Sequence, residues 1–578
     1  MKKTICTVFL LLTVALITDS SAQSTLKAIV GGTLINPDGA NPIENAVIIV
    51  EDNRIKQVGA SENIIIPEFA ERIDVVGKWI IPGLIDAHVH FFQSGGLYTR
   101  PDIVDLRKHV PYSEGELAQI RGRLPDTFAR YLRCGITSVV DVGGPFWNYE
   151  VRAAALQTDL APRVAVAGPL ISTYQPEALT TDDPPIIKVN TVEEVRSLVQ
   201  KQIASETDLI KIWYIVRPGE SPEDNFALVQ AAVEESHKHG VRVAVHATQL
   251  ETARAAVKAG ADILVHSVDD EVVDSSFIQL LKDNNVIYTP TLIVSEGYAE
   301  VLSQQIKLTM AEYDMANPYV VSTLFDLREL PTGDIPDRIL NQMEHPTPVI
   351  SNGIMLKNLK LLQDAGINIA AGTDAGNIGT LHGPAIFREF ELMAEAGLTP
   401  MQVLTAATIN GAKLMGRFPE LGSITPGKLA DLVILNADPL EDIRNVSDIY
   451  LVMKDGKGYT LNEILKKTPE DIVQQQVNAY NARDIDAFLA TYSPEIKGYN
   501  HPDSLIFSGL QEMRSRYQPF FENNPKLHGQ ITNRISMGRY VIDQEYVTGL
   551  KNGRTIQAAA IYEIQDAIIN RVWFIPKR

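Results

Sequence analysis

Two histidines stand one residue apart at a spacing that could bind a metal. His88 and His90 end a short run at 80–90 that is rich in Ile and Leu and contains a Pro-Gly pair. Such a run predicts a buried strand rather than a helix, and residues i and i+2 of a strand point to the same face. The two imidazoles would lie side by side at the carboxyl end of that strand, where they could share a divalent cation. Considered alone, the pair is equally consistent with two hydrogen-bonded core histidines.

Four more polar side chains occur on later predicted strands or at their ends. Their spacing corresponds to whole strand–helix units with one insertion before the last, which would place them in one ring at the mouth of a barrel. Imidazole and carboxylate groups are common ligands of divalent metals. The four residues are Lys211 within 208–213, His246 at the end of 242–246, His266 at the end of 262–266, and Asp374 just after 367–372.

Lys211 is the most informative of these residues. It lies in the apolar segment Leu-Ile-Lys-Ile-Trp, where a bare ammonium group is costly to bury. A buried lysine must be paired, deprotonated or chemically modified. The alternative is a lysine whose stem is buried while its charged end reaches solvent.

Strand-like and helix-like segments alternate through about eight units between residues 81 and 415, which predicts an α/β fold with a parallel (β/α)8 barrel of the TIM type. The active site of such a barrel lies at the carboxyl ends of its strands. Residues 296–350 interrupt the alternation with five prolines and predict an insertion after the seventh strand that shapes the substrate pocket. Further strands are predicted at 135–141, 163–167 and 286–290, and helices at 226–239, 251–259 and 350–365.

Short alternating strands flank the barrel at 26–80 and 416–460, which predicts one small β-sandwich assembled from both flanks. Residues 467–578 predict a separate α+β domain, in which a helix at 469–490, interrupted near Arg483, precedes a curved antiparallel sheet. The strands of that sheet are expected at 530–536, 539–548, 554–564 and 568–575.

A chain of 578 residues is too long for one core, and its net charge of −19 argues against nucleic acid or anionic membranes as partners. Residues 1–22 combine a charged start, an apolar run and a small-residue end, the pattern of a cleavable signal peptide. The apolar run is too short for a membrane span. We therefore expect a periplasmic or secreted protein, monomeric or homo-oligomeric. After cleavage Cys134 would be the one remaining cysteine, so no internal disulfide is expected.

Together these motifs resemble the amidohydrolase superfamily, in the branch of imidazolonepropionases and amidohydrolase-type Xaa-Pro dipeptidases. The resemblance covers about residues 26–460. His-x-His alone is not specific, whereas the ordered set of motifs is. The set comprises Pro-Gly-Leu-Ile-Asp-Ala-His-Val-His, Lys-Ile, Val-His-Ala, Val-His-Ser, Gly-Thr-Asp-Ala and, near the end, Gly-Ser-Ile-Thr-Pro-Gly-Lys-Leu-Ala-Asp.

The resemblance implies two divalent metal ions bridged by a carboxylated lysine at Lys211. Imidazolonepropionases usually hold one metal without such a lysine, so Lys211 favours the dipeptidase-like branch. Zinc is the expected metal, although the ligand types do not exclude others. One cation would be bound by His88, His90 and Asp374, and the other by His246 and His266.

Such a centre implies hydrolysis by an activated hydroxide. Two cations lower the pKa of a bound water from about 15.7 to about 7. The resemblance assigns catalytic roles to His246, whose cation would polarise the substrate carbonyl, and to the bridging Lys211. Asp374 would first accept a proton from the hydroxide and then deliver it to the leaving amine.

The substrate implied is a dipeptide or an N-acyl amino acid, whose carboxylate would need cations and hydrogen-bond donors near the mouth. For each candidate an ordinary loop residue is an equally valid interpretation. A cyclic amide or ester is an alternative substrate, and a non-catalytic periplasmic ligand-binding protein is a further alternative. The candidate substrate-binding residues are Tyr98, Arg100, Tyr214, Arg217 and His382.

The terminal segment resembles the SnoaL-like, ketosteroid-isomerase-like fold, on the residues at 473–492 and 562–574. The resemblance implies a cone with an internal pocket, and many such domains dimerise or bind a ligand. Tyr499, His501 and Asp543 are expected near that pocket. They form no convincing acid–base pair, so no catalysis is assigned to this domain.

Overall fold

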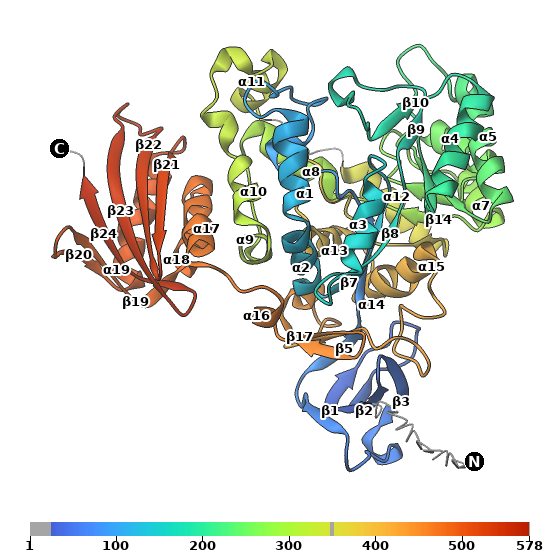
Figure 1. Ribbon diagram of the computed structural model, residues 1–578, viewed down its shortest axis with the longest axis horizontal. Helices are drawn as coiled ribbons and strands as arrows, with labels where there is room; N and C mark the ends of the chain where they lie inside the picture. Colours follow the sequence, from blue (N-terminus) through green and yellow to red (C-terminus); the bar gives the residue numbers. More distant parts are fainter. Residues whose placement is uncertain (1–24, 347–351, 577–578) are drawn as a thin grey trace, which may run out of the picture.

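The protein contains three parts of different architecture (Figure 1). The computed structural model describes residues 25–346 and 352–576, so the predicted signal peptide lies outside the described residues. The predicted barrel, the sheet built from both flanks and the terminal α+β domain are all present. Among the described residues, none of the helices has both the length and the apolarity that crossing a bilayer requires.

Parallel strands form the central barrel in two hydrogen-bonded groups. Asp208 N donates to Val166 O, which joins the end of one group to the start of the other. Ala87 N donates to Ala371 O and closes the ring. The strands are β6 (Leu84–Val89), β7 (Ile136–Asp141) and β8 (Arg163–Val166), followed by β11 (Leu209–Trp213), β12 (Arg242–His246), β13 (Ile263–Val265), β14 (Ile287–Thr289) and β15 (Asn368–Ile369).

Amphipathic helices cover the outside of the barrel and begin at side chains that cap them. Thr191 accepts a hydrogen bond from Glu194 N at the start of α4, and Ser221 forms a capping box with Asp224 at the start of α5. The covering helices are α2 (Leu124–Arg133), α3 (Asn148–Ala155), α4 (Val192–Ala204), α5 (Pro222–Lys238), α6 (Leu250–Lys258), α7 (Ser275–Asp283), α12 (Asn352–Asp364), α13 (Ala385–Glu395), α14 (Pro400–Thr405) and α15 (Gly411–Met415). Two short strands that sequence reasoning missed, β9 (Leu170–Ser172) and β10 (Ile186–Lys188), extend the sheet beside β11.

The insertion after β14 is mainly helical, and its prolines mark where helices start. Pro318 occupies the first turn of α10, and Asn317 caps that helix by accepting from Tyr319 N. Pro336 directly precedes α11. Residues 347–350 of the predicted insertion lie outside the described residues. The helices are α8 (Ile293–Ser303), α9 (Met310–Met315), α10 (Pro318–Thr323) and α11 (Asp337–Glu344).

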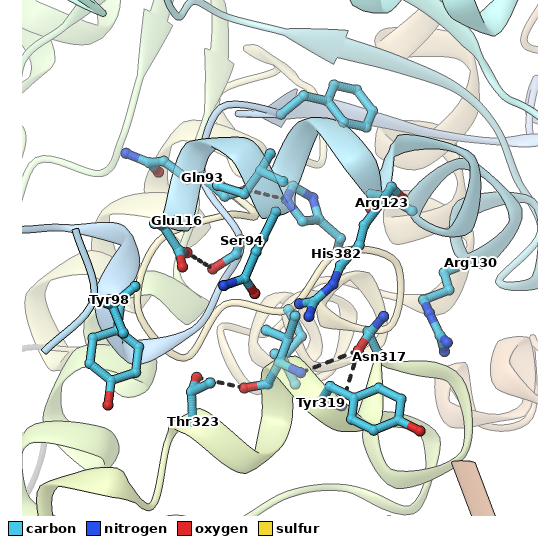
Figure 2. A pocket seen from close by; sticks show the side chains of 17 residues that line it. Gln93, Ser94, Tyr98, Glu116, Arg123, Arg130, Asn317, Tyr319, Thr323 and His382 are labelled. Atoms are coloured by element: carbon cyan, nitrogen blue, oxygen red, sulfur yellow. Dashed lines mark hydrogen bonds between the residues drawn. The ribbon is translucent and has the colours of Figure 1, made fainter. Parts of the chain in front are cut away.

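Helix α10 and the segment that follows β6 enclose a cavity of about 150 Å³ (Figure 2). Its wall also includes α1 (Ala118–Gly122) and the loop that carries His382. Ser94 Oγ donates to Glu116 Oε1 at 2.5 Å on one side of this cavity. On the opposite wall Asn317 Oδ1 accepts from the start of α10.

Both flanks of the barrel contribute to one sheet that curls around a common core. Ile80 of β5 pairs with Ile434 of β16, which joins the two flanks. Ile55 N donates to Lys428 O, so the sheet also closes toward β3. The order is β18-β17-β16-β5-β1-β2-β3, with β4 beside β1. The strands are β1 (Leu26–Leu34), β2 (Ile43–Glu51), β3 (Arg54–Ala60), β4 (Glu71–Asp74), β5 (Trp79–Pro82), β16 (Leu432–Leu435), β17 (Ile449–Lys454) and β18 (Lys457–Tyr459).

The terminal domain combines three helices with a sheet of order β20-β19-β24-β23-β22-β21. Arg483, in a left-handed conformation, ends α17, and Asp484 caps α18, which explains the interruption predicted near this point. Helix α19 and strands β19 and β20 were not predicted. The elements are α17 (Pro469–Ala482), α18 (Ile485–Ala490), β19 (Tyr492–Asn500), β20 (Ser504–Ser508), α19 (Leu510–Asn523), β21 (His528–Met537), β22 (Tyr540–Thr548), β23 (Ile556–Gln565) and β24 (Ile568–Pro576).

Helix α17 joins the terminal domain to the insertion of the barrel. Asn478 Nδ2 donates to Pro318 O at 2.7 Å, and Arg328 donates to Asn481 O at 2.9 Å. Tyr313 of α9 is buried within the hydrophobic core of the terminal domain. Polar and apolar contacts therefore both cross this boundary.

Candidate active site

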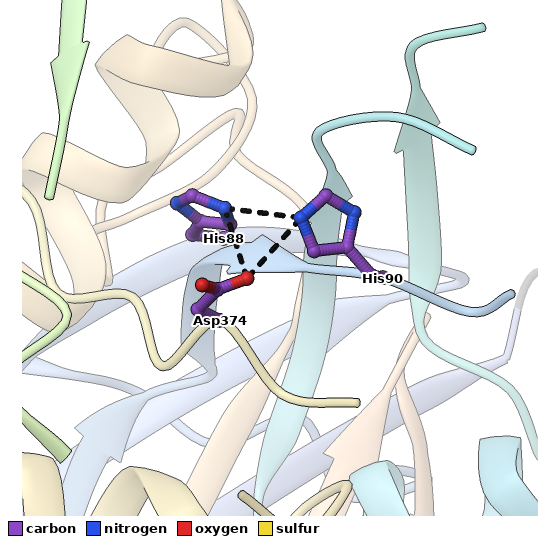
Figure 3. Close-up of side chains that lie close together, drawn as sticks. All are labelled: His88, His90 and Asp374. Atoms are coloured by element: carbon purple, nitrogen blue, oxygen red, sulfur yellow. Dashed lines mark hydrogen bonds and ion pairs between the residues drawn. The ribbon is translucent and has the colours of Figure 1, made fainter. Parts of the chain in front are cut away.

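Three ligand-type atoms converge at the carboxyl end of β6 (Figure 3). Asp374 Oδ1 lies 3.3 Å from His88 Nε2 and 3.2 Å from His90 Nε2, and the two imidazole nitrogens are 3.4 Å apart. His90 Nδ1 lies 2.6 Å from the carbonyl oxygen of Gly143, so Nδ1 donates and Nε2 of the neutral ring presents a lone pair. Electron-rich atoms that face one another in a buried space fit a cation between them.

A second pair of imidazoles lies beside this group. The ring centroids of His246 and His266 are 4.4 Å apart, and those of His88 and His266 are 4.9 Å apart. His266 Nδ1 lies 2.8 Å from Thr291 Oγ1 and 3.8 Å from Asp374 Oδ2. All four predicted histidines and Asp374 thus occupy one site.

Burial and neighbouring side chains together set the pKa values in this site. Desolvation lowers the pKa of His88 and of His246 to about 3, and it holds the pKa of His266 well below its ordinary value. For Asp374 burial opposes ionisation, but the neighbouring His88 and His90 hold its pKa well below the ordinary range. Neutral imidazoles and an ionised carboxylate are the forms that bind divalent metals.

Lys211 lines the same site and is 1% exposed. Its Nζ has no hydrogen-bond partner among the described residues. Desolvation lowers the pKa of Lys211 to about 7. The nearby negative charge of Asp374 acts in the opposite direction and raises this pKa. The alternative interpretation of a lysine whose charged end reaches solvent is therefore wrong, because the whole side chain is enclosed.

The backbone around the ligands is held by two buried carboxyl groups. Asp86 accepts from Thr373 N at 3.0 Å and from Thr373 Oγ1 at 2.7 Å, which joins β6 to the loop before Asp374. Asp141 accepts from Phe91 N and from Gly143 N, each at 3.0 Å. These contacts fix the two segments that carry His88, His90 and Asp374.

Two of the predicted ligands adopt backbone conformations that are rare outside glycine. His266 has φ 76° and Asp374 has φ 57°. Non-glycine residues in the left-handed region carry strain that surrounding structure must offset, and such residues are common in active sites. Asp374 N donates to His88 O at 2.7 Å, which is one of the contacts that hold this conformation.

A cavity of about 470 Å³ is lined by most of the predicted ligands and by both polar and apolar residues. Arg100 lines it and donates to Asn377 Oδ1 at 2.6 Å, to Tyr298 OH at 3.1 Å and to Asp102 through Nε and Nη2. A large part of the wall is apolar. Its residues include Leu170, Leu179, Ile186, Trp213 and Met355.

Of the five predicted substrate-binding residues, Arg100 is the one that lines this cavity. Tyr98 and His382 lie in the smaller cavity of Figure 2 instead, with Tyr98 OH donating to Asp326 and His382 packed between Tyr131 OH and Gln93 O. Tyr98 therefore contacts the insertion and His382 contacts α2.

Tyr214 and Arg217 also lie outside the site. Tyr214 OH donates to Pro222 O at the start of α5. Arg217 is exposed and pairs with Glu220, with Nε 2.9 Å from Oε1. Both side chains follow β11, but Tyr214 contacts the start of α5 and Arg217 contacts the loop before it, which sequence proximity to Lys211 does not reveal.

Sequence reasoning missed Asn377 and Tyr298. Asn377 follows Asp374 by three residues and could have been noticed for that reason. Tyr298 lies in the insertion, and no local pattern connects it to the ligands. Tyr298 OH donates to Asn377 Oδ1 at 2.7 Å, so the two residues form one polar wall with Arg100.

Comparison with known proteins adds to this geometry. A model of the amidohydrolase family matches residues 79–458, and a model of the SnoaL-like domain matches residues 473–572. The ochratoxinase of Aspergillus niger is 25% identical over 468 residues, which cover 74% of this chain and 85% of that protein. The imidazolonepropionase of Fusobacterium nucleatum is 25% identical over 428 residues, covering 69% and 87% respectively.

Solved structures show the same fold. A Xaa-Pro dipeptidase with bound methionine superposes with a TM-score of 0.58 at 24% identity, over 75% of this chain and 100% of that chain. A putative prolidase from Bifidobacterium longum gives a TM-score of 0.57 at 26% identity, over 78% and 99%. Both predicted resemblances are confirmed. The chain belongs to the amidohydrolase family of hydrolases and carries a C-terminal SnoaL-like domain.

Proposed function

We propose that this hydrolase depends on divalent metal ions and cleaves the amide bond of a dipeptide or an N-acyl amino acid. The observation that carries the proposal is the convergence of neutral imidazoles, an ionised carboxylate and an enclosed, unpaired lysine in one cavity with Arg100. Such a cavity supplies ligands for metals at one end and a cation for a substrate carboxylate at another.

His88, His90 and Asp374 would hold one cation, and His246 and His266 the other. The lone pair of His90 Nε2, directed by the hydrogen bond from Nδ1 to Gly143, fits this assignment. When bound, divalent cations of this kind supply hydroxide at neutral pH and polarise a carbonyl group. Zinc suits imidazole and carboxylate ligands.

Lys211 is proposed as a carboxylated bridge between the two cations. Its neutral amine would add to carbon dioxide and release one proton, which leaves a carbamate with two ligand oxygens. The carbamate oxygens would bind the cations, so the buried side chain would no longer end in an amine without partners, as it does among the described residues.

Asp374 is proposed to move the proton. Oδ1 faces His88 and His90, while Oδ2 lies on the side of His266 and remains able to accept a proton. During amide cleavage the carboxylate would take a proton from the attacking water and pass it to the leaving nitrogen. The left-handed backbone of Asp374 fixes this orientation.

Arg100 is proposed to bind the substrate carboxylate. Asp102 and Asn377 hold its guanidinium in the wall of the cavity, so little side-chain entropy would be lost on binding. The apolar part of the wall would receive the side chain of the substrate. The Xaa-Pro dipeptidase and prolidase structures are consistent with a substrate of this class.

A cyclic amide or an ester is the second candidate substrate. The size of the cavity and the aromatic surface of Trp213 favour such a substrate, and the similarity to imidazolonepropionase and ochratoxinase also supports it.

We further propose that the chain is exported to the periplasm or the medium, with removal of residues 1–22. Mass spectrometry of the exported protein should then find Gln23 at its start.

Metal analysis and a substrate screen test the proposal. Protein purified without chelator should contain about two metal ions per chain, and Lys211→Ala should lower that number while Lys258→Ala, an exposed lysine on α6, should not. A panel of dipeptides, N-acyl amino acids, cyclic amides and esters should identify one class that is turned over. Fewer than one metal ion per chain, with no turnover across the panel, would favour a non-catalytic ligand-binding protein.

A further inference from the structure

The smaller cavity of Figure 2, of about 150 Å³, is separate from the metal-site cavity. Among the described residues, Gln93 is the one that lines both cavities. A protein cavity of about 150 Å³ can hold benzene, so this one admits a ligand of about six non-hydrogen atoms. Of its lining residues, Gln119 is exposed and Arg123 is partly exposed, which marks the side from which a solute can enter.

Arg123 places a cation without a partner in this cavity. Figure 2 shows its side chain pointing into the cavity. Its guanidinium group forms no hydrogen bond or ion pair with any of the described residues. Arg130, the other arginine in the wall, is already engaged, because Nε donates to Asp126 Oδ2 at 2.7 Å and Nη1 donates to Ala316 O at 2.6 Å. Arg123 is therefore the cation that a ligand can reach.

Glu116 supplies the opposite charge in the same wall. The residue is 7% exposed, and its Oε1 accepts from Ser94 Oγ at 2.5 Å. Burial raises the pKa of the Glu116 carboxyl group, whereas Ser94 and Arg123 act in the opposite direction. Arg123 is thus close enough to act on Glu116, yet among the described residues no ion pair joins the two side chains. A guanidinium and a carboxyl group that line one cavity without touching favour a ligand that carries both charges.

The cavity lies beside the segment that carries the predicted ligand His90. Phe91 lines the cavity and stacks on His382, with the ring centroids 5.7 Å apart. Gln93 N donates to His90 O at 3.1 Å, and Gln93 O lies 2.7 Å from His382 Nε2. A ligand in this cavity would contact the segment that positions His90 without occupying the cavity lined by Arg100.

We propose that the smaller cavity binds a small α-amino acid with an uncharged side chain. The ligand carboxylate meets Arg123, its ammonium group meets Glu116, and its side chain lies against the apolar lining residues Ile120 and Leu381. A simple anion lacks the group that Glu116 attracts, and a simple cation lacks the group that Arg123 attracts. The hydrolysis proposed above would release an amino acid of this class, so the link to a reaction product, though not the binding itself, rests on the proposed function.

Isothermal titration calorimetry of the full-length chain with L-alanine tests the proposal. Two analogues each lack one charge: propanoate lacks the ammonium group, and L-alaninamide lacks the carboxylate. We expect saturable one-to-one binding of L-alanine, and binding of each analogue weaker by at least about tenfold.

Variants locate the binding. Arg123→Met should weaken L-alanine by at least about tenfold, and Glu116→Gln should weaken it and bring its affinity closer to that of propanoate. Arg121→Met is the matched control on α1, because Arg121 is exposed, does not line the cavity and pairs with Glu150 at 2.6 Å. Arg100→Met should also retain the binding, since Arg100 lines the metal-site cavity instead. Far-UV circular dichroism checks the fold of each variant.

The proposal would be overturned by absence of saturable binding, by equal affinity for L-alanine and either analogue, or by undiminished binding in a folded Arg123→Met variant. Loss of binding in Arg100→Met alone would place the amino acid in the metal-site cavity and would also overturn it. Turnover and metal content are measured separately, so failure of this binding leaves the proposed function intact, and failure of the proposed function leaves this binding intact.

Discussion

Gly297 of α8 and Gly379 of the loop after Asp374 touch backbone to backbone. A Cβ atom added to Gly379 would lie 2.7 Å from Gly297 Cα, and Gly379 has φ 82°. A Cβ atom added to Gly297 would lie 3.0 Å from the carbonyl carbon of Gly379. This close approach packs α8 of the insertion against the loop that follows Asp374, which allows Tyr298 to contact Asn377.

Gly297→Ala should therefore impair substrate binding without removing a polar group. The added methyl group pushes α8 away from the loop and lengthens the contact between Tyr298 and Asn377, so KM should rise more than kcat falls. Steady-state kinetics on a substrate found in the screen provide the measurement. Gly353→Ala in α12 is the control, because nothing lies within 4 Å of its added methyl group. Equal kinetics for the two variants would contradict this role of the contact.

Asp374→Asn should reduce turnover by about 10²–10⁴-fold, because the amide cannot accept and release the proton. Metal content measured on the same sample separates loss of the proton carrier from loss of a ligand. Asp364→Asn, at the exposed end of α12, should leave turnover unchanged. Turnover of Asp374→Asn close to wild type would rule out the assigned proton transfer.

Arg100→Met should reduce kcat/KM for a carboxylate-bearing substrate by roughly 10- to 100-fold, the effect of a charge-assisted hydrogen bond worth about 1.5–3 kcal/mol. The carboxamide analogue of the same substrate should lose much less. Arg217→Met removes an exposed arginine that pairs with Glu220 and should have no effect on either substrate. If both substrates lost activity equally through Arg100→Met, the arginine would act through structure rather than through the carboxylate.

Glu389→Gln should make stability less dependent on pH. Burial raises the pKa of the Glu389 carboxyl from 4.5 to about 8, its Oε2 accepts from Ile293 N at 2.9 Å, and its Oε1 is unpaired among the described residues. Between these pKa values the folded chain holds a proton that the unfolded chain has released. Stability therefore falls as pH rises through this window, by up to about 1.4 kcal/mol per pH unit, and the slope ends above the folded pKa.

Thermal unfolding midpoints across this pH window provide the measurement. Glu395→Gln, a half-exposed residue on the same helix, is the control, and its profile should follow wild type. A Glu389→Gln profile parallel to wild type would mean that Glu389 is already ionised in the folded chain.

Regular patterns allowed much of this molecule to be predicted from sequence. The apolar run before His88 predicted a strand, in which His88 and His90 would share a face. The glycines after the helices marked the ends of the repeating units of the barrel. Buried strands are recognisable from their apolar composition. Counting the strand–helix units between Lys211 and Asp374 therefore predicted that both residues lie in one ring at the mouth of the barrel. A single sheet built from both flanks was likewise expected. The pairing of Ile80 with Ile434 was not, because residues 80–90 were predicted as one strand, which the structure divides into β5 of this sheet and β6 of the barrel.

The substrate wall could not be predicted in the same way. Tyr98, close in sequence to the first ligands, faces the smaller cavity because Asp326 of the insertion binds its hydroxyl. Tyr298, far in sequence from every ligand, reaches the site because two glycines let α8 approach. The direction of a loop depends on such long-range contacts, and these contacts produce no repeating pattern of residues in the sequence. Strands β9 and β10, which extend the sheet beside β11, were missed because these three-residue strands likewise show no repeating pattern.

Helix α17 presents Gln476 and Val477 to the interior of the terminal domain, while Asn478 bonds to the insertion of the barrel. Tyr313 makes the reverse crossing, from the insertion into the terminal core. A chain cut before α17 would therefore not be a smaller version of the same hydrolase, since it would leave an aromatic side chain and backbone acceptors facing water. The barrel insertion and the terminal domain therefore share buried contacts, so removing either one exposes surface that the other covers.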